Sequence, residues 1–120
     1  MTTVIQSMDD DRARLKILAR ALEPFRTVRN ALPLQYVQTL VAVMIEPDMT
    51  TNEIAEATGI APAMVSRQLA DCGRVNRYHR PGYGLVETRE DPMDRRFHRT
   101  NLTATGRAMA GQVINAMGAP

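Results

Sequence analysis

The chain has 120 residues and a formal net charge of +2, and 44% of its residues are hydrophobic. A chain of this length can bury one modest core, so we expect a single domain over residues 1–120. Its one cysteine excludes an internal disulfide and a cysteine-cluster metal site. The sequence shows neither a signal-peptide pattern nor an apolar run near the ~20 residues of a membrane span, which predicts a cytoplasmic protein without membrane contact.

Charge is spread unevenly along the chain. Residues 1–66 hold 6 basic and 8 acidic side chains, whereas residues 67–120 hold 9 and 5. Fourteen of the 15 basic residues are Arg, whose planar fork suits phosphate and guanine, although a GC-rich genome also favours Arg. The positive charge therefore lies in the second half.

The first predicted helix runs from about Asp9 to Leu22. Acidic residues suit its N-terminus, and Pro24 is expected to end it. A mixed, basic connector from Phe25 to Leu32 should follow. The apolar stripe of this helix consists of Leu15, Ile17, Leu18, Ala21 and Leu22.

A densely apolar core helix is predicted next, from Leu34 to Ile45, with Pro33 just before it. Thr50 and Glu53 then have the spacing of a capping box, which begins another helix. Gly59 supplies the positive φ that ends this helix.

The following helix starts near Pro62 and should show Ala63, Ser66 and Arg67 to solvent while Val65 and Leu69 are buried. Two helices joined by a short glycine-containing turn match the helix-turn-helix unit that docks in a DNA major groove. An ordinary corner between two helices of a helical domain is the alternative.

The segment Gly73 to Gly84 interleaves three arginines with Tyr78 and Tyr83. Such a pattern can follow a nucleic-acid backbone, and it can also be a solvated loop. We expect the tyrosines to pack back on the body and the arginines to lie near DNA.

A β-hairpin is predicted from the strands Leu85–Glu90 and Phe97–Leu102. Turn-forming residues occupy 91–94 between them, with Arg95 and Arg96 just past the tip. Thr103 should cap a last helix to about Met117. The elements together predict an α+β, mostly helical, winged helix-turn-helix fold.

The sequence LVETREDPMDRRFHRTNLTATGR, which begins at Leu85, resembles the wing and following helix of the MarR family of transcriptional regulators. Thr51 to Leu69 is similar to the family's helix-turn-helix, and the likeness covers about residues 32 to 110. Two departures stand out. Gly73 to Gly84 looks like an insertion, and Ala61 replaces the Ser that commonly caps the family's recognition helix.

The resemblance implies a homodimer that represses transcription by binding double-stranded DNA at a pseudo-palindromic operator. It also implies a cleft for small aromatic ligands, which the family builds from a C-terminal helical region longer than the single helix predicted here. Position by position, the recognition helix offers Ala63, Met64, Ser66 and Arg67 to DNA. The wing offers Arg89, Arg95 and Arg96, and Asp91 and Asp94 would orient the wing.

Dimerisation is also expected from the residues themselves. The winged core needs about residues 32–102, so the helices of 1–31 and 103–120 carry apolar faces wider than that core can cover. A partner subunit is the economical way to bury them. We therefore expect N- and C-terminal dimerisation helices around a winged-helix core.

No catalytic chemistry is predicted. His79 and His98 have no metal-ligand partners at suitable spacing, Ser66 lacks a nucleophile elbow, and no glycine-rich phosphate cradle occurs. Cys72 is expected to be a core residue, with a redox-sensing thiol as the alternative. The rival functions are a winged-helix protein–protein adaptor and an architectural DNA-binding protein of weak specificity.

Overall fold

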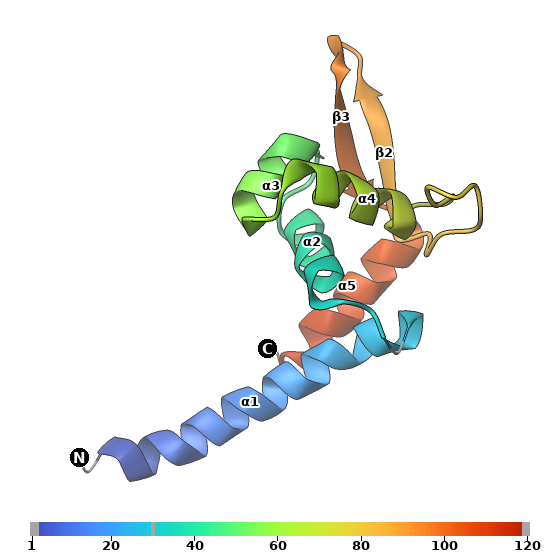
Figure 1. Cartoon of the computed structure of the whole chain (residues 1–120). Helices are drawn as coiled ribbons and strands as arrows, with labels where there is room; N and C mark the ends of the chain where they lie inside the picture. Colours follow the sequence, from blue (N-terminus) through green and yellow to red (C-terminus); the bar gives the residue numbers. More distant parts are fainter. Residues whose placement is uncertain (1–2, 30, 119–120) are drawn as a thin grey trace. The chain divides into compact units, whose positions relative to one another are not determined.

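The computed structural model describes residues 3–29 and 31–118, with backbone alone at residues 3–8. The chain forms two compact units, residues 1–31 with 109–120 and residues 32–108. The second unit contains a bundle of three helices and a β-hairpin that projects from it (Figure 1). In the described part of the chain, no helix is both long and apolar enough to cross a membrane.

The fold is α+β and mostly helical, and the predicted winged helix-turn-helix is confirmed. In chain order the elements are α1 (Thr3–Val28), α2 (Leu34–Ile45), β1 (Met49–Thr50), α3 (Thr51–Thr58), α4 (Pro62–Cys72), β2 (Val86–Asp91), β3 (Asp94–Leu102) and α5 (Ala104–Ala116).

Helix α1 is longer than predicted. Pro24 lies inside it, so the predictions that Pro24 ends the helix and that a connector begins at Phe25 are wrong. An internal proline removes one backbone hydrogen bond and costs about 3 kcal/mol. Phe25 is only 4% exposed and continues the buried side begun by Ala21, one turn earlier. Burying a Phe side chain gains roughly 1.5–3 kcal/mol, which offsets much of that cost.

Helix α2 has the predicted bounds and supplies the centre of the second unit. Thr39, Leu40, Ala42 and Val43 are buried along it, and α2 contacts α3, α4 and β3. The other large, fully buried side chains of this unit come from each of those elements and from β2, and they are Ile54, Val65, Gln68, Cys72, Val86 and Thr100.

The helix-turn-helix forms as its local signals predict. The Thr50 hydroxyl accepts a hydrogen bond from the Glu53 backbone N–H (3.2 Å), and the Glu53 carboxylate accepts one from the Thr50 N–H (3.0 Å). Gly59 ends α3 in the left-handed region at φ 74°. Ala61 is the N-cap of α4 and supplies no side-chain hydrogen bond, whereas Pro62 occupies the first turn.

The three strands form an antiparallel sheet in the order β1-β3-β2. Strand β1 was not predicted, because two residues are too short to show a periodic pattern. The hairpin also extends further than expected, since Asp91 pairs with Asp94 and leaves Pro92 and Met93 as the turn. The predicted four-residue tip is therefore wrong. Strand pairing uses backbone groups, so it continues through charged residues that carry no apolar signal.

Helix α5 begins against the base of the hairpin. Thr103 caps it, as predicted, by accepting a hydrogen bond from the Gly106 N–H (3.1 Å), and the same hydroxyl donates to the Gly84 carbonyl (2.6 Å). A Cβ atom on Gly106 would lie 2.1 Å from the Leu85 carbonyl oxygen. Only glycine allows α5 to start this close to the strand.

We predict that Gly106→Ala destabilises the protein by about 1–3 kcal/mol, because the backbone at Leu85 has to move. Gly111→Ala is the matched control, since it lies in the same helix and its would-be Cβ has no atom within 4 Å apart from its chain neighbours and the nearby backbone of its own helix. It should instead stabilise by roughly 0.4–1 kcal/mol. Urea unfolding at one protein concentration measures both, and equal stability of the two variants would contradict the close contact.

Candidate nucleic-acid interface

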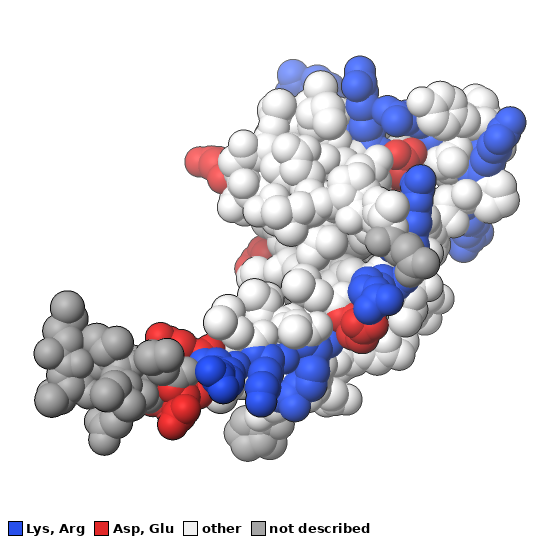
Figure 2. Space-filling model, turned by 60° about the horizontal axis from the view of Figure 1, so that its bottom comes forward, with Lys and Arg blue, Asp and Glu red and all other residues white. Residues whose placement is uncertain are grey.

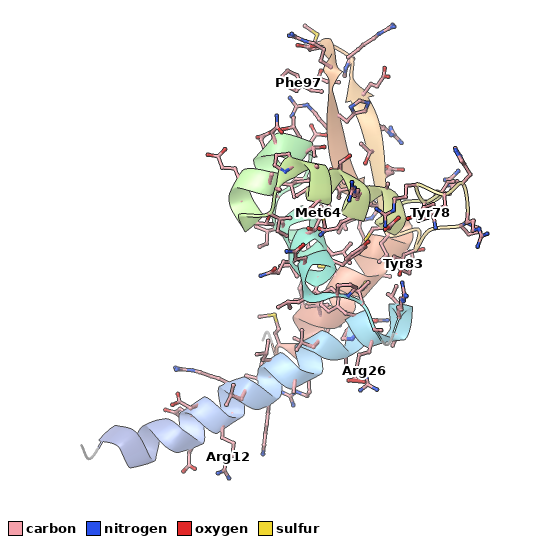
Figure 3. All side chains as sticks on the ribbon, in the orientation of Figure 1. Arg12, Arg26, Met64, Tyr78, Tyr83 and Phe97 are labelled. Carbon is pink, nitrogen blue, oxygen red and sulfur yellow. The ribbon has the colours of Figure 1, made fainter. Side chains whose placement is uncertain are left out.

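The exposed face of α4 is the first part of the candidate interface. Ala63, Met64, Ser66 and Arg67 are all exposed, and Met64 is labelled on this helix in Figure 3. Arg67 has no hydrogen-bond or ion-pair partner among the described residues. The face therefore combines small, polar and basic groups that a groove of a duplex can accept.

The opposite face of α4 is fixed by a buried polar chain. The Thr39 hydroxyl donates to the Gln68 side-chain oxygen (2.6 Å), and the Gln68 amide donates to the Gln35 side-chain oxygen (3.0 Å). Gln68 is 1% exposed, so without these partners its amide would cost about 1–3 kcal/mol of stability. The two hydrogen bonds fix the rotation of α4 about its own axis relative to α2.

The wing tip is organised by its two aspartates. Asp91 Oδ1 accepts from the Met93 N–H at the turn (2.8 Å). Asp94 binds Arg96 in a forked pair, with Oδ1 3.0 Å from Nε and Oδ2 2.7 Å from a terminal guanidinium nitrogen. The Arg96 guanidinium also lies 5.9 Å from the centre of the Phe97 ring. Arg95 is exposed and has no ion-pair partner among the described residues, so the two tip arginines differ in freedom.

Arg99 holds the wing to the helix-turn-helix, and the sequence did not point to it. Its Nε donates to Asp91 Oδ2 (2.8 Å), and its terminal nitrogen donates to the Asp48 carbonyl (3.0 Å) and lies 3.8 Å from the Glu53 carboxylate. Asn101 adds a hydrogen bond from its amide to the Asp48 carboxylate (3.1 Å). The pairing of β2 with β3 shifts register between Glu90 and Asp91, so that Arg99 lies opposite Arg89, two residues from Asp91. A regular hairpin with either turn length would have placed Arg99 further from Asp91, and the sequence does not indicate the shift.

Arg89 lies directly opposite Arg99 across the β2–β3 pair. Two like charges in this position repel one another. Here each has an acidic neighbour, because Arg89 lies 3.4 Å from Glu87 while Arg99 binds Asp91. Arg89 is also the more exposed of the two, with 79% of its side chain accessible against 36%. The structure thus leaves Arg89 available and uses Arg99 internally.

Hydrogen bonds hold the pKa of both wing carboxyls below the usual value. For Asp91 the largest cause is the Met93 N–H, followed by Arg99, and for Asp94 it is the Arg96 side chain. A carboxyl with a lowered folded-state pKa stabilises the fold above its unfolded pKa of about 3.9, and that stability is lost as the pH falls through the folded pKa. The wing bonds are therefore intact at neutral pH and are lost only when the pH falls through these lowered pKa values.

Two expectations about other residues have different outcomes. Cys72 is buried, which raises the pKa of its thiol to about 12, so it is a core residue and its thiolate is disfavoured. Tyr78 is 66% exposed, so the prediction that the tyrosines pack back on the body is wrong for it. The reason is that Asn76 folds the loop on itself, which turns Tyr78 outward (Figure 3).

No cluster of three metal-binding side chains occurs in the described ranges.

The structure brings these sequence-predicted residues together in two groups within residues 32–108. Arg89, Asp91, Asp94, Arg95 and Arg96 belong to the wing, and Ala63, Met64, Ser66 and Arg67 belong to α4. The hairpin tip projects beyond α3 and α4 (Figure 1). One element can therefore enter a groove while the other extends past it.

No protein-family model matches the sequence, and no curated protein matches it significantly. Solved structures do match. "Transcriptional repressor, CouR, bound to a 23-mer DNA duplex" is 28% identical with a TM-score of 0.58, over 90% of this chain and 69% of that one. The MarR family transcription regulator SP03579 is 23% identical with a TM-score of 0.61, over 95% and 70%. Wild-type MarR from E. coli is 19% identical with a TM-score of 0.62, over 98% and 76%.

The structural likeness extends over nearly the whole chain, and it agrees with the wing and helix-turn-helix motifs of the sequence. The chain has the winged-helix fold of these transcription regulators.

Proposed function

We propose that this chain is a sequence-specific regulator of transcription that binds double-stranded DNA as a homodimeric repressor on a pseudo-palindromic operator. The observation that carries the proposal is the exposed, unpaired Arg67 on an α4 whose opposite face is fixed by Gln68. A similar fold in CouR is described as a repressor bound to duplex DNA. The proposed role is binding in the cytoplasm and not catalysis.

In this proposal α4 lies in the major groove. Arg67 makes a forked contact with a guanine edge, and Ser66 contacts a base or a phosphate. Ala63 and Met64 provide apolar contact with thymine methyl groups. A forked pair with a base gives about 1–3 kcal/mol of discrimination against the wrong base.

The wing reaches the neighbouring minor groove. Arg95 is free to follow the negative potential of a narrow groove, and Arg96 is presented there by Asp94. Asp91 acts on the wing through Arg99 and not through DNA, because a carboxylate close to phosphates is repelled. Arg89 faces the backbone lower on the hairpin. These contacts supply affinity more than sequence preference.

Dimerisation is supported by apolar side chains on α1 and α5 that remain exposed. Leu15, Leu18 and Leu22 lie on one side of α1 at helical spacing, and Leu18 is 53% exposed. Ile114 on α5 is 55% exposed. Each such side chain gains roughly 1.5–3 kcal/mol when it is buried. A second copy of the chain covers these faces and gives one α4 per half-site.

An architectural, weakly specific DNA-binding role rests on the same arginines. An architectural protein would bind DNA without a consensus sequence, so the variants below distinguish that role from the role of a sequence-specific regulator. An adaptor that binds protein through this surface would need an apolar contact face, whereas α4 offers one large apolar side chain, Met64, on its exposed side.

We predict that Arg67→Ala and Arg95→Ala affect DNA binding differently. Loss of Arg67 should reduce the discrimination between a selected site and a random duplex by about 1–3 kcal/mol. Loss of Arg95 should weaken binding to both duplexes alike and lower the salt slope by about 0.9 for each phosphate that is no longer neutralised. Fluorescence anisotropy over a salt series measures both effects. The assignment fails if the two variants have the same profile.

We also predict that Leu18→Glu converts the dimer to a monomer, because it places a charge within the apolar side of α1. Ala13→Glu is the matched control, since it adds the same charge to the other side of the helix at an exposed position. Mass in solution by light scattering distinguishes the two. A Leu18→Glu protein that stays as dimeric as the control would rule out this face.

A further inference from the structure

Residues 73–84, here termed the arginine loop, connect the end of α4 to β2 and are built as a fixed structure. Four backbone hydrogen bonds close its base. They run from Leu85 to Cys72 (2.8 Å), Gly84 to Gly73 (2.9 Å), Tyr83 to Asp71 (3.1 Å) and Gly82 to Arg74 (2.9 Å). A Cβ on Gly82 would lie 2.2 Å from the Gly73 carbonyl oxygen, so the two arms of the loop are in close contact.

The tip of the loop is organised by Asn76. Its side-chain oxygen accepts hydrogen bonds from the Tyr78 N–H (2.9 Å) and the Arg80 N–H (3.1 Å). Its own N–H donates to the Arg80 carbonyl (2.7 Å), and its carbonyl accepts from the His79 N–H (3.0 Å). These bonds fix the backbone from which the exposed side chains extend, and an ordered backbone lowers the entropy cost of binding a partner.

The arginine loop is positively charged, and no acidic side chain within it balances that charge. It holds three arginines and no acidic residue. Arg74 and Arg80 are exposed and have no ion-pair partner within the described ranges. Arg77 lies 3.8 Å from Asp71 and 4.9 Å from the centre of the Tyr78 ring, so it is partly engaged. Like charges held close together repel, and an anionic partner relieves that repulsion.

The position of the loop joins the two parts of the candidate interface. Arg74 and Arg89 line the same hollow of ≈ 370 Å³, between the last turn of α4 and the base of the wing. Figure 2 shows blue side chains at the top and right edge of the winged-helix unit, where few red ones lie among them. The hollow therefore joins an arginine of the loop to an arginine of the wing, with Glu87 of β2 also in its lining.

We propose that the arginine loop is an additional phosphate-binding element, in which Arg74 and Arg80 bind the duplex backbone beside the end of α4. The proposal rests on the proposed DNA-binding function and extends it to a surface outside the helix-turn-helix and wing. A helix in the major groove has a phosphate backbone on each side, so a basic loop at the end of that helix meets one of them. Contacts of this kind add affinity and register and read no bases.

The test compares wild type with R74Q/R80Q in binding to a labelled random-sequence duplex over a potassium chloride series. We expect the slope of log affinity against log salt to fall by about 0.9 for each phosphate that the variant leaves unbound. R74K/R80K keeps both charges and should keep the wild-type slope. R12Q/K16Q removes two exposed charges from α1 and should also keep it. Thermal unfolding of each variant verifies that it folds.

Each outcome separates the loop from the wider function. If wild type binds the duplex and R74Q/R80Q has an unchanged slope, the loop has no phosphate contact and the DNA-binding function stands. If R12Q/K16Q reduces the slope as much as the loop variant does, overall charge is the cause and the loop proposal is overturned. If wild type binds no duplex at low salt, both proposals fail together.

Discussion

The rotational setting of α4 is the constraint on which the rest of the winged-helix unit depends. The Gln68 side chain is buried, and it forms one hydrogen bond with Thr39 and one with Gln35, both on α2. A rotation of α4 would break them inside the core, where an unpaired amide is costly. This buried link determines that Ser66 and Arg67 face outward, because they share a helix with Gln68. The set of side chains that α4 exposes is therefore a consequence of the hydrogen bonds on its buried side.

A second set of contacts fixes the position of the wing relative to the helix-turn-helix. β3 pairs with β2 on one side and with β1 on the other, and β1 runs directly into α3. Arg99 sits on β3 and binds Asp91 near the tip and Asp48 ahead of β1. The hairpin is consequently attached to the helix-turn-helix by backbone and side chain together. A projecting two-stranded ribbon is marginal alone, and this attachment gives it a defined direction.

The sequence predicted the elements whose signals are local. The Thr50–Glu53 capping box, the left-handed Gly59 and the Thr103 cap all form as expected, since each depends on residues within one turn. It failed at Pro24, where burial of Phe25 offsets much of the cost of an internal proline, and at β1, whose partner strand is some 50 residues away. The exposed side of α4 could be predicted from the helical period. The role of Arg99 could not, because its contact with Asp91 depends on a register shift between Glu90 and Asp91 that leaves no pattern in the sequence. Tertiary contacts explain each of these failures.

The most direct measurement is selection of bound duplexes from a randomised library, with the mass of the complex determined in solution. We expect a dimer that recovers an inverted repeat, with half-site centres about one DNA turn, ~34 Å, apart. Steeply salt-dependent binding with no consensus would contradict sequence-specific reading by α4. Absence of any duplex binding at low salt would contradict the nucleic-acid role itself.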